Sequence, residues 1–204
     1  MPKERRIPTQ PRSREKYDQL LESAKELIGQ KGNDAVSMRE ISKHSGVALA
    51  SIYQYFPDKN AILQAIMEGY FGQIREIIIS SIEECKSINE LRKKIDGGVD
   101  IFYLMFKNEP VLATLWAGLQ ANTKLRELDA NDSLVNAELI ANKICSIMGD
   151  DNKQKFFDSL VLLLNMAGVA VRLAITLPEP QGDRLIAEFK QIALLRLNSF
   201  VQPE

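Results

Sequence analysis

The stretch Ser37–Phe56, SMREISKHSGVALASIYQYF, contains the signals of two short helices separated by a glycine turn. Ser37 and Glu40 have the spacing of a capping box, in which the hydroxyl and the carboxylate each accept a hydrogen bond from a free backbone N–H. Gly46 can take a positive φ and so end the first helix. Pro57 disfavours helical geometry at the residue before it and so ends the second. Two short helices with this connection predict a helix-turn-helix, whose second helix enters the major groove of DNA.

An amphipathic segment lies before this motif and predicts a third helix. It should begin near Ser13, because apolar residues recur at helical spacing from Tyr17 to Ile28. A unit of three short helices has one core, so this apolar face must pack on the other two helices. Its predicted partners are Ile41, Val47, Ile52 and Phe56.

The stretch GVALASIYQYFPDKNAIL, residues 46–63, resembles the core of the TetR family of bacterial transcriptional regulators. The matching residues are Gly46, Val47, Ile52, Tyr53, Tyr55, Phe56 and Lys59. The resemblance covers about the first 70 residues and implies a DNA-binding domain, here residues 1–58 with the motif at 37–56, followed by an effector-binding and dimerisation domain, 59–204. Ala48 departs from the pattern, since a Ser or Thr usually caps this helix. Loss of that cap costs about 0.5–2 kcal/mol.

The segment Ala48–Tyr55 is the predicted recognition helix. Gln54 can make a bidentate contact with adenine, and Ser51 can contact several base edges. Ala48 and Leu49 suit apolar contact with thymine methyl groups. The family resemblance implies phosphate contacts for Tyr53, Tyr55 and Lys59. Ser37 and Arg39, at the start of the preceding helix, are two further candidates for phosphate contact. The predicted DNA-contacting residues are Ser37, Arg39, Ala48, Leu49, Ser51, Tyr53, Gln54, Tyr55 and Lys59.

The charge of the 204-residue chain is distributed unevenly, although its net value is only −1. Residues 1–60 hold 11 Lys and Arg against 8 Asp and Glu, and residues 61–204 hold 15 against 19, so the balances are +3 and −4. A basic N-terminal arm therefore leads into the predicted motif. It is either a solvated tail or an arm that follows phosphates or enters the minor groove.

The rest of the chain has helical apolar spacing and no alternating run typical of a strand. Asp58 can cap a long helix that leaves the DNA-binding domain. Five later breaks are predicted where turn and capping residues cluster: Ser87–Glu90, Asn108–Pro110, Asp129–Asp132, Gly149–Asp151 and Pro178–Pro180. The predicted fold class is all-α, with about nine helices.

The apolar run Leu160–Leu177 is long enough to resemble a membrane span, but Asn165 and Arg172 interrupt it and interfacial anchors are missing. We predict a buried helix and no membrane partner. The resemblance implies that the last two long helices form the interface of a homodimer. A dimer places two recognition helices on one palindromic operator.

Large apolar and aromatic residues concentrate in the middle of the second predicted domain. Most are interpreted as core. The resemblance also implies a cavity for an apolar small-molecule effector of unknown identity. The candidate lining residues are Phe102, Tyr103, Phe106, Trp116, Gln120, Asn165 and Met166.

Other function classes find little support in the sequence. The single histidine, His44, lies inside the DNA-binding motif, and no metal-ligand cluster, glycine-rich phosphate loop or catalytic set is present. We therefore predict no enzyme, no cofactor and no metal. Cys85 and Cys145 are interpreted as buried, reduced thiols of a cytoplasmic protein. A ligand-independent regulator controlled by a protein partner or by its abundance remains the alternative, and a repressor is the family default.

Overall fold

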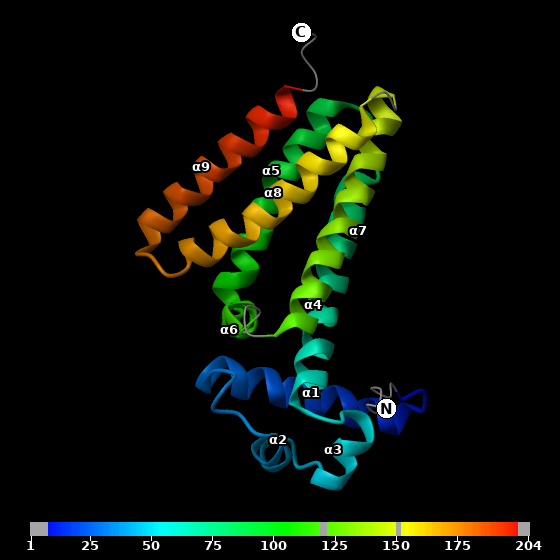
Figure 1. The fold of residues 1–204 in the computed structure, drawn as a ribbon, viewed down its shortest axis with the longest axis vertical. Coiled ribbons are helices and arrows are strands. Elements are labelled where there is room, and N and C mark those ends of the chain that lie inside the picture. The colour runs from blue at the N-terminus through cyan, green and yellow to red at the C-terminus, as the bar shows by residue number, and fades with distance from the viewer. Residues whose placement is uncertain (1–7, 119–121, 150–151, 200–204) are drawn as a thin grey trace. The chain divides into compact units, whose positions relative to one another are not determined.

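The computed structural model describes residues 8–118, 122–149 and 152–199, and within these ranges the chain forms nine α-helices and no strand (Figure 1). The helices are α1 (Pro11–Lys31), α2 (Met38–Ser45), α3 (Leu49–Tyr55), α4 (Lys59–Ile82), α5 (Ile88–Asn108), α6 (Pro110–Gly118), α7 (Thr123–Met148), α8 (Lys153–Ala174) and α9 (Glu179–Asn198). The prediction of an all-α fold is confirmed for the described residues.

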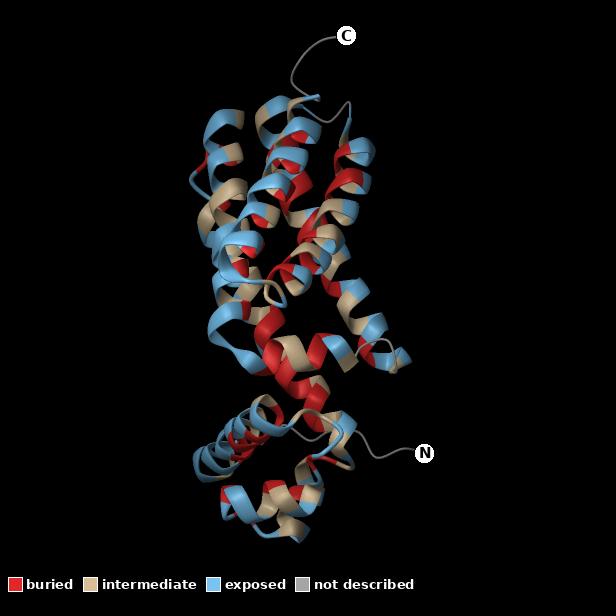
Figure 2. Cartoon of the chain, turned by 90° about the vertical axis from the view of Figure 1, so that its left-hand side faces the viewer, coloured by how far each residue is buried: buried red, intermediate tan, exposed pale blue. Residues whose placement is uncertain are grey.

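The helices divide into two compact units. The first comprises Met1–Phe71 with Glu109–Leu125, and the second comprises Gly72–Asn108 with Arg126–Glu204. Within each unit, buried residues follow one side of the helices and exposed residues the other (Figure 2). The division of function at residues 1–58 and 59–204 stays a prediction.

The first unit is built on the buried face of α1. The helix begins at Pro11, two residues before the predicted start, and ends at Lys31, followed by Gly32 as the C-cap with a φ of 80°. Its buried side chains include Tyr17, Leu20 and Ala24, as the sequence predicts. The predicted partners Ile41, Val47, Ile52 and Phe56 are all buried too.

The short helix α6 also belongs to the first unit, where it packs on α1. A Cβ atom added at Gly29 would lie 3.4 Å from the backbone nitrogen of Val111, so the two helices approach closely there. The Tyr70 hydroxyl donates a hydrogen bond of 2.8 Å to the Glu109 carboxylate just before α6. These contacts attach α6 to the unit that contains the helix-turn-helix.

The second unit is a helical bundle in which α8 and α5 both pack on α9. Gly182, in the first turn of α9, is needed for a close approach, because a Cβ atom there would lie 2.5 Å from the carbonyl oxygen of Ala174. The main core contains Ile82, Cys85, Leu91, Ala137, Ile140, Ala141, Ile144, Cys145, Phe156, Leu160 and Leu197. Both cysteines are buried, as predicted.

One predicted break is wrong. Helix α7 runs from Thr123 to Met148 through the segment Asp129–Asp132, and the break lies earlier, after α6 ends at Gly118. The Asp132 side chain is buried, pairs with Arg75 of α4 and accepts a 2.7 Å hydrogen bond from the Asn136 amide. Because its carboxylate is engaged by other side chains, it does not compete for the backbone of its own helix.

The Asp132→Leu variant is expected to lose about 1–3 kcal/mol of unfolding free energy, because it leaves the Arg75 guanidinium and the Asn136 amide without their carboxylate. Urea denaturation followed by circular dichroism measures this loss. The matched control is Glu138→Gln on the same helix, whose surface ion pair with Lys153 should contribute about 0–1 kcal/mol. Equal losses in the two variants would show that the buried pair has no special role.

Candidate nucleic-acid interface

The N-terminus of α2 is held by the capping box that the sequence predicts. The Ser37 hydroxyl accepts from the backbone N–H of Glu40 at 3.3 Å, and the Glu40 carboxylate accepts from the backbone N–H of Ser37 at 2.9 Å. Hydrogen bonding from Ser37, and then from the Lys31 ammonium, lowers the pKa of Glu40 below its usual value. The carboxylate therefore stays ionised and holds the cap at neutral pH.

The turn between α2 and α3 is held by hydrogen bonds within it and to α1. Gly46 has a φ of 68°, the left-handed conformation expected of a helix-ending glycine. The Ser42 hydroxyl donates to the Val47 carbonyl at 2.7 Å across the turn. The Gln19 amide on α1 donates to the Ser45 carbonyl at 3.0 Å, and His44 contacts Glu26 of α1 at 2.7 Å. The turn is therefore anchored to α1.

The inner face of α3 is held by apolar and aromatic packing. Ile52 and the adjoining Phe56 are fully buried. The Tyr17 ring of α1 stacks on Phe56 with 4.9 Å between ring centroids, and it meets the edge of Tyr55 at 6.0 Å. Because these contacts lie on one side, the opposite side of α3 faces outward.

The comparisons with known proteins agree with this geometry. Residues 20–66 match the family model described as "Bacterial regulatory proteins, tetR family", and residues 89–201 match "Tetracyclin repressor-like, C-terminal domain". The chain belongs to the TetR family.

Individual curated relatives match only part of the chain. The chain is 43% identical over 54 residues to the regulator YvdT of Bacillus subtilis, covering 26% of this chain and 28% of the relative. It is 34% identical over 77 residues to the fatty acid metabolism regulator protein of the same organism, covering 38% and 40%. The chain therefore spans well under half the length of these two relatives. The names of both relatives describe them as regulators.

A solved structure shares the fold over almost the whole chain. The fatty acid degradation regulator FadR from Bacillus halodurans matches with a TM-score of 0.70 at 20% identity, covering 94% of this chain and 97% of the other. At that identity the likeness shows the fold alone.

The structure brings the predicted DNA-contacting residues together in the first unit of this TetR-family chain. Those fully on the surface are Ser37, Arg39, Ala48, Tyr53 and Gln54, and the half-buried ones are Leu49, Ser51, Tyr55 and Lys59. The Lys59 ammonium donates a 2.7 Å hydrogen bond to the backbone carbonyl of Asn33, in the loop before α2. An ammonium has three donors, so two others can reach a phosphate. The sequence did not predict this role of Asn33, because the bond uses its backbone carbonyl, which every residue type has.

Helix α3 begins without a side-chain cap, as its sequence predicts. Ala48 occupies the N-cap position with φ −56° and ψ 135°, and its side chain makes no capping hydrogen bond. The Ala48→Ser variant is expected to raise the unfolding free energy by about 1 kcal/mol, because a serine hydroxyl can accept from the exposed N–H groups of α3. Thermal unfolding monitored by calorimetry tests this, with Ala50→Ser on the same helix as the control. A control that is stabilised equally would contradict the capping explanation.

The predicted ligand-lining residues that lie in the second unit come from two helices, α5 and α8. Phe102, Tyr103 and Phe106 share α5, and the Phe102 and Phe106 rings meet at 5.1 Å. Burial, and then a 3.1 Å hydrogen bond donated to Asp183, raises the pKa of Tyr103, so its hydroxyl stays protonated and links α5 to α9.

Four candidates lie outside α5. Met166 of α8 packs against the small core of Ala167, Phe189 and Ala193 in the second unit. The Asn165 side chain is exposed and donates to the Val161 carbonyl of its own helix. Trp116 lies in the first unit, where its ring meets Phe71 at 5.8 Å. Gln120 lies outside the described residues.

Proposed function

We propose that this protein is a sequence-specific DNA-binding regulator of transcription, acting in the cytoplasm as a homodimeric repressor on a palindromic operator. The observation that carries the proposal is the geometry of α3, whose inner face is fixed by Ile52, Phe56 and Tyr17 while its outer face is open. A rigid helix with an exposed polar side is what major-groove recognition requires.

The open face of α3 supplies few groups that can distinguish bases. Gln54 is the exposed residue suited to adenine, whereas Ala48 and Leu49 offer apolar contact only. Arg39 and Lys59 carry the positive charges suited to phosphates on either side of the groove. Part of the sequence preference should therefore come from DNA shape rather than from base contacts.

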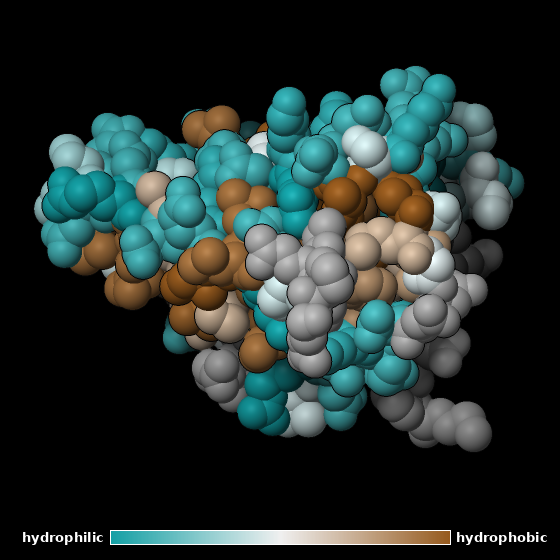
Figure 3. All heavy atoms as spheres, turned by 90° about the horizontal axis from the view of Figure 1, so that it is seen from above, coloured by the Kyte–Doolittle hydropathy of each residue, from teal (hydrophilic) through white to brown (hydrophobic). Residues whose placement is uncertain are grey.

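The proposed dimer uses α8 and α9, because each leaves an apolar face uncovered in the single chain. For the run Leu160–Leu177 the sequence predicts a buried helix, and this is correct for only one face of α8. Helix α8 is long and apolar enough to resemble a membrane span, and only 28% of its most apolar stretch is buried. On the face drawn in Figure 3, hydrophobic side chains reach the surface among hydrophilic ones. The exposed apolar residues of α8 and α9 are Leu162, Val169, Leu173, Ile192 and Leu195.

The proposed effector is an apolar small molecule that binds the second unit and releases the protein from DNA. Its support is the aromatic cluster of α5 and the names of two relatives, which are regulators of fatty acid metabolism and degradation. The alternative is a regulator without a small-molecule effector. A thermal-shift screen of acyl compounds separates the two, because a ligand that binds the folded state raises its melting temperature.

The first experiment is a gel-shift titration against the DNA upstream of the protein's own gene, with random DNA as competitor. A salt-sensitive shift over a footprinted palindrome would support the proposal. If there is no shift, selection from random DNA follows, and failure to enrich any palindrome there would overturn the proposal.

Two substitutions should separate base contacts from phosphate contacts. Gln54→Ala should cost about 1–3 kcal/mol of binding free energy on the selected site and relax the preference at one base pair. Arg39→Ala should weaken binding to all sequences and reduce the salt slope by about one unit. Fluorescence anisotropy across a salt series measures both, with Lys93→Ala on α5 as the control. Identical effects of the two variants would refute this assignment of contacts.

A further inference from the structure

Burial along helix α4 stops abruptly near its middle, although the helix itself runs without a break from Lys59 to Ile82. In the stretch from Gly72 to Ser81 no residue is buried, and Ile82 is the next buried one. The chain also divides into its two compact units between Phe71 and Gly72. The buried residues of the earlier part are Ile62, Leu63, Ala65, Ile66, Met67, Tyr70 and Phe71. Because packing supplies most of the stability of a helix in a protein, α4 is least supported just after Phe71.

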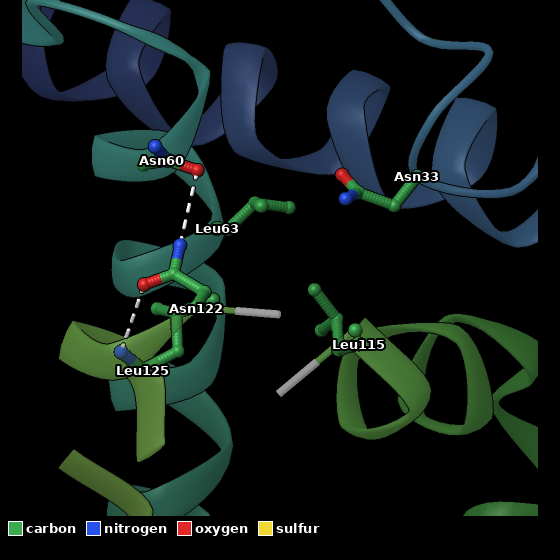
Figure 4. A pocket seen from close by; sticks show the side chains of 7 residues that line it. Asn33, Asn60, Leu63, Leu115, Asn122 and Leu125 are labelled. Atoms are coloured by element: carbon green, nitrogen blue, oxygen red, sulfur yellow. Dashed lines mark hydrogen bonds between the residues drawn. The ribbon is translucent and has the colours of Figure 1, made fainter. Parts of the chain in front are cut away.

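The part of α4 before Gly72 is fastened to the first unit at both of its ends. In its first turn the Asn60 side-chain oxygen accepts a 3.2 Å hydrogen bond from the Asn122 amide, beside a cavity of about 200 Å³ that Asn33 also lines (Figure 4). At its other end the Tyr70 hydroxyl bonds to the residue before α6, and the Phe71 ring meets a ring of α6 at 5.8 Å. This part of α4 therefore belongs firmly to the unit of the helix-turn-helix.

The later part of α4 is fastened to the second unit instead. Arg75 pairs with the buried Asp132 of α7. Ile78 and Ile82 pack in the main core of the second unit. Only three residues, 72–74, separate Phe71 from Arg75, so the change from one set of partners to the other takes less than one helical turn.

Two glycines lie inside the helix at this change, Gly69 and Gly72. A Cβ atom added at either would meet no atom within 4 Å, so no close approach requires a glycine there. Neither has a positive φ, which among the described residues occurs at Gly32, Gly46 and Gly149. Each interior glycine makes a helix about 0.8–1.0 kcal/mol less stable than alanine does, and helices bend sharply at such residues. The property that these two glycines supply is therefore reduced stiffness.

We propose that residues 69–74 of α4 form a hinge, at which the helix bends while each unit keeps its own packing. A few residues that absorb the change of φ and ψ are enough for such a motion. The consequence for DNA rests on the proposed function: in a homodimer, the hinge lets the two recognition helices engage palindromes whose half-sites differ in spacing. The cost is paid in affinity, because binding must order a flexible joint.

Amide hydrogen exchange of the full chain without DNA tests the hinge itself. We expect peptides covering residues 69–78 to exchange faster than those covering residues 60–68. In a chain that carries Gly69→Ala and Gly72→Ala, exchange at residues 69–78 should slow by about tenfold or more, and elsewhere it should change little. Equal exchange along α4 in the unmodified protein, or no slowing in the double variant, would overturn the hinge.

The matched control carries Gly97→Ala and Gly98→Ala. These glycines also lie inside a helix and also have no atom within 4 Å of an added Cβ, but their helix, α5, lies wholly within the second unit. The control should leave the exchange of residues 69–78 unchanged. Slowing of that segment in the control as well would show that general stabilisation, rather than the local glycines, explains the effect, and would count against the hinge.

A series of operators with one base pair added or removed at the centre tests the consequence for DNA. Each base pair changes the half-site separation by about 3.4 Å and rotates one half-site by about 35°. Fluorescence anisotropy should show that the unmodified protein binds all three operators within about tenfold. The Gly69→Ala, Gly72→Ala variant should bind the best operator more tightly and reject the other two by at least about tenfold more.

The two experiments fail separately. The same spacing preference in the variant and in the unmodified protein would overturn the role of the hinge in operator choice. If neither protein binds any palindrome, the proposed regulatory function is wrong, and the exchange measurement, which uses no DNA, still decides whether α4 contains a hinge.

Discussion

A chain that carries Leu162→Glu and Leu195→Glu is expected to be monomeric and to bind its operator at least about 100-fold more weakly than the unmodified protein. Leu162 is 61% exposed on α8 and Leu195 is 67% exposed on α9. In a homodimer built on these helices, each carboxylate would be placed in an apolar interface without a partner. Loss of the dimer removes the effective concentration that the second recognition helix contributes, which is commonly worth about 10²–10⁴ in affinity.

Sedimentation velocity measures the oligomeric state, and anisotropy on a full palindrome and on a single half-site measures the binding. The matched control is Leu104→Glu, because Leu104 is an equally apolar residue, 50% exposed, but lies on α5. The control should remain dimeric. A double variant that stays dimeric, or a control that dissociates as well, would place the interface elsewhere.

The Phe56→Ala variant is expected to lose about 3–5 kcal/mol of unfolding free energy and its specific DNA binding with it. Phe56 has no exposed surface, stacks on Tyr17 and lies directly after α3. Removing the ring opens a cavity between α1 and α3, so α3 loses the contact that sets its orientation. Chemical denaturation with a fluorescence probe measures the stability, and gel shift measures the binding.

Tyr53→Ala is the informative control for Phe56→Ala. Tyr53 lies on the same helix but is 46% exposed, so its loss should change stability by less than about 1 kcal/mol. It should nevertheless weaken binding to all DNA sequences, because the proposed contact of Tyr53 is with the phosphate backbone. If both variants were equally destabilised, Tyr53 would belong to the core rather than to the DNA-binding surface.

Local signals predicted the helix-turn-helix of this protein in detail. The Ser37–Glu40 capping box, the positive φ of Gly46, the uncapped Ala48 and the burial of Ile52 all occur where the sequence places them. Each depends on the preferences of a few neighbouring residues, so the chain itself contains the information. The same local reasoning failed at Asp129–Asp132, where polar residues that usually mark a turn lie inside α7.

The reason for that failure is a contact between distant residues. Asp132 is satisfied by Arg75, which is 57 positions away in the chain, and no local pattern reports such a partner. Three other features have the same origin: the packing of α6 on α1, the bond between Lys59 and the Asn33 carbonyl, and the cavity beside Asn33.

The sequence alone determined the helical class, the helix-turn-helix and the residues that point outward from it, because periodicity and capping act within a few turns of one helix. Only the tertiary structure decided which helices share a core, where burial along α4 is interrupted and which apolar faces of α8 and α9 stay uncovered. Those properties depend on surfaces that meet only after the chain has folded, and sequence periodicity shows that a face is apolar without showing what covers it.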